Sequence, residues 1–446
     1  MVSTEQIYRE VRALLVIGGP LMATQLTQMA MGFFDTVMMG RVGPVELAAV
    51  AVGTGLWHTL FLLALGILMA LSPSVAHLQG AGRMAEIGPL VRQALWLALV
   101  LGLCSFLSLR YLDGLLYRVG VDAAIVPVAR DYLRALSWGM FPIFAAMALR
   151  LFSEGVGRTQ PVLLISLLGL AVNVVANYVL IFGHWGFPAL GASGCGMATA
   201  LGMGVMLIGM GSLVVWDHRY RIYGLFSRWD WPSWQMLRPL LILGLPIGIG
   251  LFMETAIFAT VALLLGTLGA VAAAAHQVAL NVAALTFMIP LGLSMATTIR
   301  VGHAMGRGDA GAARLSGWTG VGLGASFMAV MAVLILVGHR TIAGFYTDDV
   351  EVAAVAAGLL QLAALFQISD GLQVGALGAL RGLKDTRVPM MIIIVAYWLI
   401  AFPLAWQLGI RMGMGPAGPW IGLIVGLTVA ALLLNARFWR LSARLE

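Results

Sequence analysis

Residues 160–182 read QPVLLISLLGLAVNVVANYVLIF, a run without a single charged side chain. A helix that crosses the roughly 30 Å hydrocarbon core of a bilayer needs about 20 such predominantly apolar residues. Strands are excluded because the run is too long and lacks the alternation of a membrane barrel. Similar segments follow one another along the chain, so we predict twelve membrane-spanning helices at 13–36, 47–78, 90–111, 125–149, 160–182, 189–216, 237–265, 270–298, 315–337, 352–380, 388–408 and 418–438.

The composition of the whole chain agrees with a protein built for a membrane. Of its 446 residues, 61% are hydrophobic and only 10% are charged, whereas about a quarter of a soluble protein is charged. This excludes a cytosolic enzyme and a disordered scaffold. The net charge of +7 is scattered, with no block of five like charges, so we expect no nucleic-acid partner. Cys104 and Cys195 are too isolated to predict a disulfide framework or a metal site.

The basic residues predict how the chain is oriented. If the N-terminus is cytoplasmic, 19 of the 26 basic residues fall on the inner side and 7 on the outer side. This bias follows the positive-inside rule, so we expect both termini in the cytoplasm. The polar start leads into the first apolar run without a small-residue cleavage pattern, and we therefore expect no removable signal peptide.

The second half of the sequence repeats the first at a constant offset. Gly18 aligns with Gly244 and Pro20 with Pro246, and further glycines keep the same offset. We therefore predict two pseudo-symmetric six-helix bundles, an N-lobe at 1–216 and a C-lobe at 237–446, joined by a cytoplasmic linker at 217–236. Six spans per half make the repeats parallel, an arrangement that transporters use with a site between the repeats and alternating access.

Three acidic residues interrupt the predicted spans: Asp35, Glu254 and Asp370. A charged side chain at mid-depth costs about 2.5–3.5 kcal/mol on insertion scales. No basic residue lies within these spans to neutralise the three carboxylates. The pattern favours a cation as partner, either a proton, Na⁺ or an organic cation. The structural alternative is that each carboxyl group is protonated and hydrogen-bonded to a neighbouring helix.

Amide side chains accompany these carboxylates at helical spacing. Asn173 and Asn177 share one face of the fifth span, and Gln277 and Asn281 share one face of the eighth, beside His276. These groups could complete a cation shell or line a wet cavity. They could equally make hydrogen bonds between helices. His276 could titrate, or it could be a hydrogen-bonded packing residue.

Several motifs together resemble the multidrug and toxic compound extrusion (MATE) family, in its NorM-like bacterial branch. They are Pro20 with Gln25, Phe33–Gly40 (FFDTVMMG), Ser153–Pro161 (SEGVGRTQP), Asn173–Tyr178 (NVVANY), Met253-Glu254 and Ser369-Asp370. The resemblance covers nearly the whole chain. It implies a V-shaped, all-α, twelve-helix antiporter of the bacterial inner membrane. Such a protein expels cationic amphipathic drugs and dyes in exchange for Na⁺ or H⁺, and we expect a monomer without a cofactor.

The resemblance also assigns roles by position. Asp35, Asn173, Asn177 and Thr199 resemble the N-lobe cation site. Glu254 and Asp370 resemble the C-lobe carboxylates, to which we add Gln277 and Asn281 as cation or substrate ligands. Some relatives carry a carboxylate where Asn177 stands, and others carry a tyrosine where Phe366 stands. The coupling ion therefore stays open, with Na⁺ possible at Glu254, Asp370 or Asp35.

Two other functions compete with drug export. A lipid-linked precursor flippase of the same superfamily moves an anionic headgroup and predicts Arg or Lys inside the spans, where this sequence has acidic residues. An intramembrane prenyl- or acyltransferase needs a metal-binding acidic pair or a catalytic His–acid pair at a membrane boundary. The one Asp-Asp pair, Asp348-Asp349, lies in a predicted outer loop. We therefore expect a transporter and not an enzyme.

Overall fold

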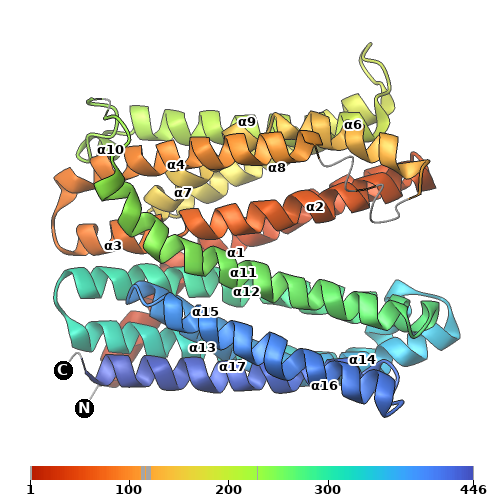
Figure 1. Cartoon of the computed structure of the whole chain (residues 1–446). Helices are drawn as coiled ribbons and strands as arrows, with labels where there is room; N and C mark the ends of the chain where they lie inside the picture. Colours follow the sequence, from red (N-terminus) through yellow and green to blue (C-terminus); the bar gives the residue numbers. More distant parts are fainter. Residues whose placement is uncertain (1–2, 112–115, 117–121, 229, 445–446) are drawn as a thin grey trace. The chain divides into compact units, whose positions relative to one another are not determined.

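The computed structural model describes residues 3–111, 116, 122–228 and 230–444, and this part of the chain is helical with no β-strand (Figure 1). The predicted N-lobe and linker include residues 112–115, 117–121 and 229, which lie outside the described residues. The helices are α1 (Thr4–Gly40), α2 (Pro44–Leu68), α3 (Leu71–Gly80), α4 (Met84–Tyr111), α6 (Ile125–Ser137), α7 (Met140–Gly155), α8 (Gln160–Phe182), α9 (Gly191–Trp216), α10 (His218–Arg221), α11 (Trp234–Gly266), α12 (Ala270–Gly306), α13 (Ala310–Tyr346), α14 (Val350–Gly382), α15 (Arg387–Ile394), α16 (Phe402–Trp406) and α17 (Ala417–Ala443), with π-helical segments η1 (Val395–Ala401) and η2 (Gln407–Arg411).

The described helices confirm the predicted spans. Eleven spans, with α2–α3 and α15–η2 each counted as one, are long and apolar enough to cross a membrane, and the bent pair α6–α7 makes a twelfth. Each predicted segment overlaps one of these twelve. The eleventh span, Arg387–Arg411, runs through α15, η1, α16 and η2, and its π-helical turns were not predicted.

The fourth span contains a bend close to Pro142. Helices α6 and α7 meet at 48° around Gly139. Pro142 lacks the amide hydrogen that would bond to the carbonyl of Trp138 four residues earlier. A Cβ on Gly139 would lie 2.7 Å from the sulfur of Met203 and 3.0 Å from the Cα of Ala200. The missing hydrogen bond permits the bend, and the glycine permits the close approach of α9.

Contacts divide the chain into two compact units, unit 1 (Met1–Met22 and Ile249–Glu446) and unit 2 (Ala23–Gly248). The boundaries predicted from the sequence are 1–216, 217–236 and 237–446, so the structure differs at both ends. The segment Met1–Met22 packs with the second half, and residues 217–248 pack with the first. The two crossing points, after Met22 and after Gly248, are separated by the same offset as the two copies of the internal repeat. Each half therefore contributes the start of its first spanning helix to the other unit.

Polar and apolar contacts hold the start of α1 in unit 1. The buried carboxylate of Glu10 accepts hydrogen bonds from Nε of Arg300 at 2.9 Å and from the hydroxyl of Ser316 at 2.7 Å. Leu14 and Leu21 are fully buried in an apolar cluster with Leu293, Ala296 and Ile299. The internal repeat in the sequence gives no sign of these contacts with α12 and α13, so a boundary predicted from the repeat does not account for them.

Direct backbone contact holds the start of α11 in unit 2. A Cβ on Gly66 of α2 would lie 2.3 Å from the Cα of Gly248, and a Cβ on Gly244 would lie 2.1 Å from the carbonyl oxygen of Ile67. Helices α2 and α11 approach this closely only because glycines face each other across the contact. The start of α11 therefore belongs with α2.

The predicted linker at 217–236 packs onto unit 2. Arg92 of α4 is 2% exposed and donates hydrogen bonds to Asp230 at 2.5 and 2.8 Å and to two backbone carbonyls of the linker. The Tyr220 hydroxyl lies 2.5 Å from the Ser153 hydroxyl on α7. Burial raises the pKa of Tyr220 above its ordinary value, so the phenol stays neutral in this contact.

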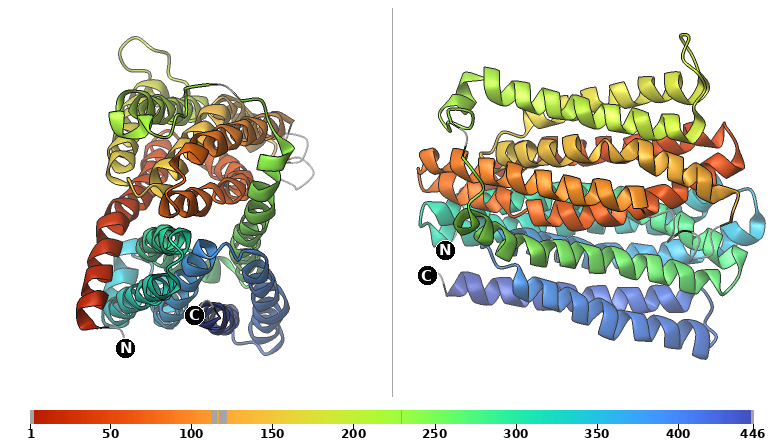
Figure 2. Two further views of the ribbon diagram at one scale, coloured as in Figure 1. Left: turned by 90° about the vertical axis from the view of Figure 1, so that its left-hand side faces the viewer. Right: turned by 45° about the horizontal axis from the view of Figure 1, so that its top comes forward.

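Unit 1 has its core among four long helices. Helices α12, α13, α14 and α17 lie side by side and bury a continuous apolar cluster (Figure 2). Helix α1 begins, and α17 ends, at the same end of this unit (Figure 1). The start of α1 and the end of α17 therefore lie at one end of the helices of unit 1, which agrees with an even number of spans.

Candidate functional site

Four residues predicted in the first half meet in unit 2, and we call this group the N-site. Asp35 lies on α1, Asn173 and Asn177 lie on α8, and Thr199 lies on α9. Nδ2 of Asn177 donates to Oδ1 of Asp35 at 2.5 Å and to Oδ1 of Asn173 at 3.2 Å. The Thr199 hydroxyl lies 3.3 Å from Oδ2 of Asp35. The structure therefore brings together all four residues.

The N-site has the chemistry of a small cation site. Asn173 and Asn177 are fully buried, and Asp35 is partly exposed. Oδ1 of Asn177 is buried without a hydrogen-bond partner among the described residues. Over the same residues, no basic side chain pairs with Asp35. One carboxylate surrounded by neutral oxygens offers ligands that a hard cation prefers, and the carboxylate alone can take a proton.

A second acidic group lies in unit 1, and we call Glu254, Asp370, Gln373 and Tyr397 the C-site. Glu254 lies on α11 and accepts a hydrogen bond from Nε2 of Gln373 on α14 at 2.7 Å. The Tyr397 hydroxyl on η1 lies 3.3 Å from the same carboxylate oxygen and 3.0 Å from Oε1 of Gln373. The structure thus joins α11, α14 and the eleventh span at Glu254.

Asp370 is the less tightly held of the two C-site carboxylates. It is 4% exposed and interacts electrostatically with Glu254. Within the described part of the chain, its carboxylate forms no hydrogen bond, in contrast to Glu254. Two neighbouring carboxylates repel each other when both are charged, so the pair favours a bound proton or cation.

Sequence reasoning missed Gln373 and Tyr397, both of which are fully buried. Gln373 follows Asp370 by three residues and therefore lies on the same face of the helix. This spacing could have been used to predict Gln373 as a site residue. Tyr397 lies in the apolar run of the eleventh span, where no sequence signal separates it from a packing residue.

Phe366 is an apolar residue close to the C-site. It precedes Asp370 by one turn of α14 and is buried. Its ring centroid lies 6.0 Å from those of Phe258 and Trp420, both in edge-on geometry. The aromatic residue expected near the site is therefore in place, without a hydroxyl to donate.

The structure of unit 1 does not bring the amides of α12 to these carboxylates. Gln277 and Asn281 share an exposed face of α12 and form no hydrogen bond with Glu254 or Asp370. The buried face of the same helix carries His276, whose two ring nitrogens have no hydrogen-bond partner among the described residues. Its edge-on contact with Trp420, at a centroid distance of 5.8 Å, is apolar packing.

One basic residue does act on the C-site, contrary to the expectation from sequence. Arg381, the last residue but one of α14, interacts electrostatically with Glu254. The prediction placed it beyond the end of the tenth span. In the structure, α14 continues to Gly382 and so includes Arg381.

Other buried carboxylates are paired, which separates them from the C-site and the N-site. Glu154 is 1% exposed and accepts a hydrogen bond at 2.6 Å from Nε of Arg150, one turn earlier on α7. Arg150 also donates to Oε1 of Gln25 at 2.9 Å. Glu154 and Glu10 lie outside the predicted spans, yet both are buried. Their arginine partners mark them as structural.

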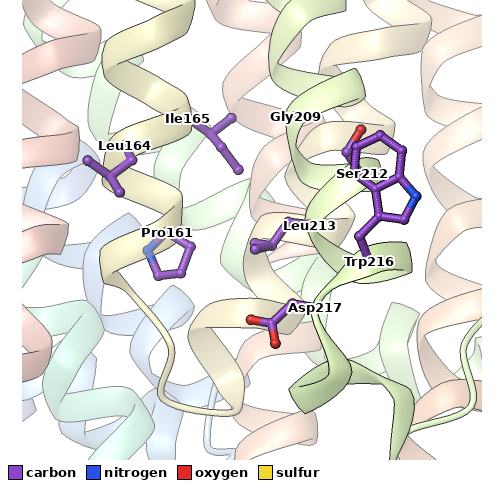
Figure 3. A pocket seen from close by; sticks show the side chains of 8 residues that line it. All are labelled: Pro161, Leu164, Ile165, Gly209, Ser212, Leu213, Trp216 and Asp217. Atoms are coloured by element: carbon purple, nitrogen blue, oxygen red, sulfur yellow. The ribbon is translucent and has the colours of Figure 1, made fainter.

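A surface groove of about 410 Å³ lies between α8 and α9, and we call it the α8–α9 groove (Figure 3). It is lined by Pro161, Leu164, Ile165, Gly209, Ser212, Leu213, Trp216 and Asp217. Ile165 precedes Asn173 by eight residues, or about 12 Å along the helix axis. The groove is therefore separate from the N-site.

Comparison with known proteins identifies the family. A family model described as MatE matches residues 20–179 and 246–407, more than half of the chain. The chain belongs to the MatE family. The two matched stretches begin at Pro20 and Pro246, which are equivalent positions of the internal repeat, so each structural repeat carries the pattern of the family.

The relatives of this MatE protein are bacterial and match it over nearly its full length. It is 45% identical to a probable multidrug resistance protein NorM of Xanthomonas campestris pv. campestris, over 99% of this chain and 97% of that one. It is 44% identical to the multidrug resistance protein PmpM of Pseudomonas aeruginosa, over 98% and 93%. With the multidrug resistance protein MdtK of Yersinia pseudotuberculosis it shares 42% identity, over 96% and 95%. The resemblance to the NorM-like branch is thus confirmed.

Solved structures share the fold of this MatE protein. The crystal structure of the eukaryotic MATE transporter AtDTX14 superposes with a TM-score of 0.89 at 21% identity, covering 98% of both chains. An outward-facing multidrug resistance MATE family transporter of the MOP superfamily gives 0.90 at 20% identity, over 98% and 96%. These matches confirm the all-α architecture of twelve spans in two bundles.

Proposed function

We propose that this MatE protein is a secondary active multidrug antiporter that exports cationic amphipathic drugs and dyes in exchange for H⁺ or Na⁺. The observation that carries the proposal is the C-site, where the buried Asp370 and the partly buried Glu254 lie in spanning helices. Among the described residues, Arg381 near a helix end is the one basic side chain that acts on Glu254. The N-site supplies a carboxylate in the other unit. Relatives at 42–45% identity named multidrug resistance proteins support export of drugs.

The exchange follows from competition for negative charge. A cationic drug and the coupling cation both lower their energy at the same carboxylates, so occupation by one weakens binding of the other. Cations arriving from outside displace the drug outward, and the empty carboxylates on the inside accept the next drug molecule. Alternating access of the two pseudo-symmetric bundles completes the cycle.

The C-site fits a proton better than Na⁺. Sodium needs several oxygen ligands, as hard cations do. At Glu254 the nearest groups, Nε2 of Gln373 and the Tyr397 hydroxyl, are placed as hydrogen-bond donors. Asp370 accepts no hydrogen bond from any described residue. The N-site, with the free oxygen of Asn177, suits Na⁺ more readily.

The positive-inside bias supports a place in the bacterial inner membrane with both termini in the cytoplasm. We propose that the protein works there as a monomer without a cofactor. The pseudo-symmetry supports this, because the chain itself supplies both halves of the transport unit.

The alternative functions receive no support from the site. A flippase for an anionic headgroup is not favoured, because the N-site and C-site are acidic. In the Asp348-Asp349 pair of the enzyme alternative, Asp349 caps a helix. Oδ1 of Asp349 accepts the backbone N–H groups of Glu351 and Val352 at 2.9 and 3.1 Å, at the start of α14.

Ethidium binding to the detergent-purified protein tests the proposal. Fluorescence titrations across the neutral pH range, with and without Na⁺, measure the dissociation constant of ethidium. Where one proton is exchanged for one drug, that constant rises about tenfold for each pH unit of acidification. Exchange for Na⁺ gives the corresponding rise with Na⁺ concentration. An affinity that neither pH nor Na⁺ changes would contradict the shared carboxylates.

A further inference from the structure

The α8–α9 groove has the size and lining of a site for one acyl chain. Its walls are almost entirely apolar, and neighbouring side chains on both helices are exposed, with Leu164 67% and Ile208 69% accessible. From Gly209 to Trp216 the groove follows α9 for about 10 Å. One leaflet provides about half of the roughly 30 Å hydrocarbon core. The groove therefore spans most of a leaflet.

Positive charge gathers where the groove ends. Asp217 begins a short turn, α10, that carries Arg219 and Arg221, and Arg158 lies 3.8 Å from Asp217. Asp217 is already engaged, because its Oδ1 accepts the backbone N–H of Arg219 at 2.9 Å. The exposed guanidinium groups of Arg219 and Arg221 form no ion pair with any residue that the structure describes. Three arginines and one aspartate leave a net charge of +2 at the mouth.

Trp216 marks the level at which the apolar groove gives way to this charge. It lines the groove, is 76% exposed and directly precedes Asp217 (Figure 3). Exposed tryptophans are enriched at the headgroup level of a bilayer. The order along the chain is thus apolar groove, interfacial indole and cationic cluster.

We propose that the α8–α9 groove binds one anionic phospholipid of the surrounding membrane. The groove takes an acyl chain, and the phosphate lies against Arg219 and Arg221. Basic pockets between spanning helices are known to hold anionic headgroups, each Lys or Arg near the surface contributing attraction of order 1 kcal/mol. The positive mouth disfavours a cationic drug, and a zwitterionic lipid gains little from it. The site lies in unit 2 and requires membrane insertion only, so it does not depend on the antiport mechanism.

Native mass spectrometry of the full-length protein with phosphatidylglycerol or phosphatidylethanolamine tests this site. The wild type is expected to retain one phosphatidylglycerol molecule at least about tenfold more tightly than phosphatidylethanolamine. Replacing Arg219 and Arg221 together with glutamine removes two attractions and weakens phosphatidylglycerol about thirty-fold. The matched double variant Arg440→Gln/Arg444→Gln makes the same charge change at exposed positions near the end of α17 and is expected to bind as the wild type does.

A third variant separates the groove from the charge. Ser212→Phe fills the groove without changing a charge and is expected to weaken both lipids by a similar factor. The proposal is overturned if Arg219→Gln/Arg221→Gln binds phosphatidylglycerol like the wild type, or if Ser212→Phe leaves its affinity unchanged. Equal retention of both lipids by the wild type would also overturn it. Ethidium binding by each variant shows that the protein is folded, and it reports on the antiport proposal separately.

Discussion

Replacing Asp370 with asparagine lowers the rate of ethidium export by at least about 100-fold. The carboxamide keeps the size of the side chain but cannot exchange a proton or attract a cation. Two charges at contact distance attract by about 4 kcal/mol at an effective dielectric constant of 20, and about 2.7 kcal/mol corresponds to a factor of 100. Reconstituted protein and dye fluorescence measure the rate. Glu254→Gln is expected to act in the same direction, with Gln373 left in place to hydrogen-bond the new amide.

The control for this result lies on the same helix. Asp349→Asn makes the same chemical change at the exposed start of α14, where asparagine caps a helix as well as aspartate does. Its transport rate is expected to match the wild type. If Asp370→Asn also transported ethidium within about twofold of the wild-type rate, the C-site would not carry the coupling.

Breaking the buried Arg150–Glu154 pair is expected to give the largest loss of stability. Glu154→Gln leaves the Arg150 guanidinium buried without a counter-charge, because its other partner, Gln25, is neutral. Removing one member of a buried ion pair costs about 3–5 kcal/mol in free energy of unfolding. Thermal unfolding of the purified variant in detergent measures the loss as a lower midpoint.

Two further variants separate pairing from packing. Replacing both residues with apolar ones, Arg150→Met/Glu154→Leu, removes both charges and is expected to recover most of the lost stability. Glu86→Gln breaks the exposed Arg83–Glu86 pair, which is three residues apart on α4 and its preceding turn, and should leave the midpoint unchanged. A double variant as unstable as Glu154→Gln would show that side-chain packing, and not the unpaired charge, determines the loss of stability.

The spans and part of the N-site could be predicted because each depends on a pattern within one short stretch of sequence. A long apolar run such as residues 160–182 can pair its backbone N–H and C=O groups within a bilayer only by forming a helix. The i, i+4 spacing of Asn173 and Asn177 puts both amides on one face wherever α8 lies. Family resemblance then placed Asp35 and Thr199 against that face, which the hydrogen bonds of the N-site agree with.

The features that escaped prediction depend on contacts between distant segments. The exchange of helix starts between the units rests on Glu10 meeting Arg300 and on glycines of α2 and α11 in backbone contact. The Tyr397 hydroxyl contacts Glu254 from a π-helical turn. The apolar sequence around Tyr397 gives no signal that predicts such a turn. Arg381 was placed outside the tenth span because the predicted span ended at residue 380, whereas α14 continues to Gly382.

The central claim is that an inward cation gradient drives drug outward through this chain. Its most direct test is ethidium movement in proteoliposomes under an imposed pH gradient without Na⁺, and under an imposed Na⁺ gradient at equal pH. We predict that ethidium accumulates against its own gradient, opposite to at least one of the two cation flows, and that an ionophore for that cation abolishes the accumulation. Ethidium movement that is the same with and without both gradients would contradict the claim.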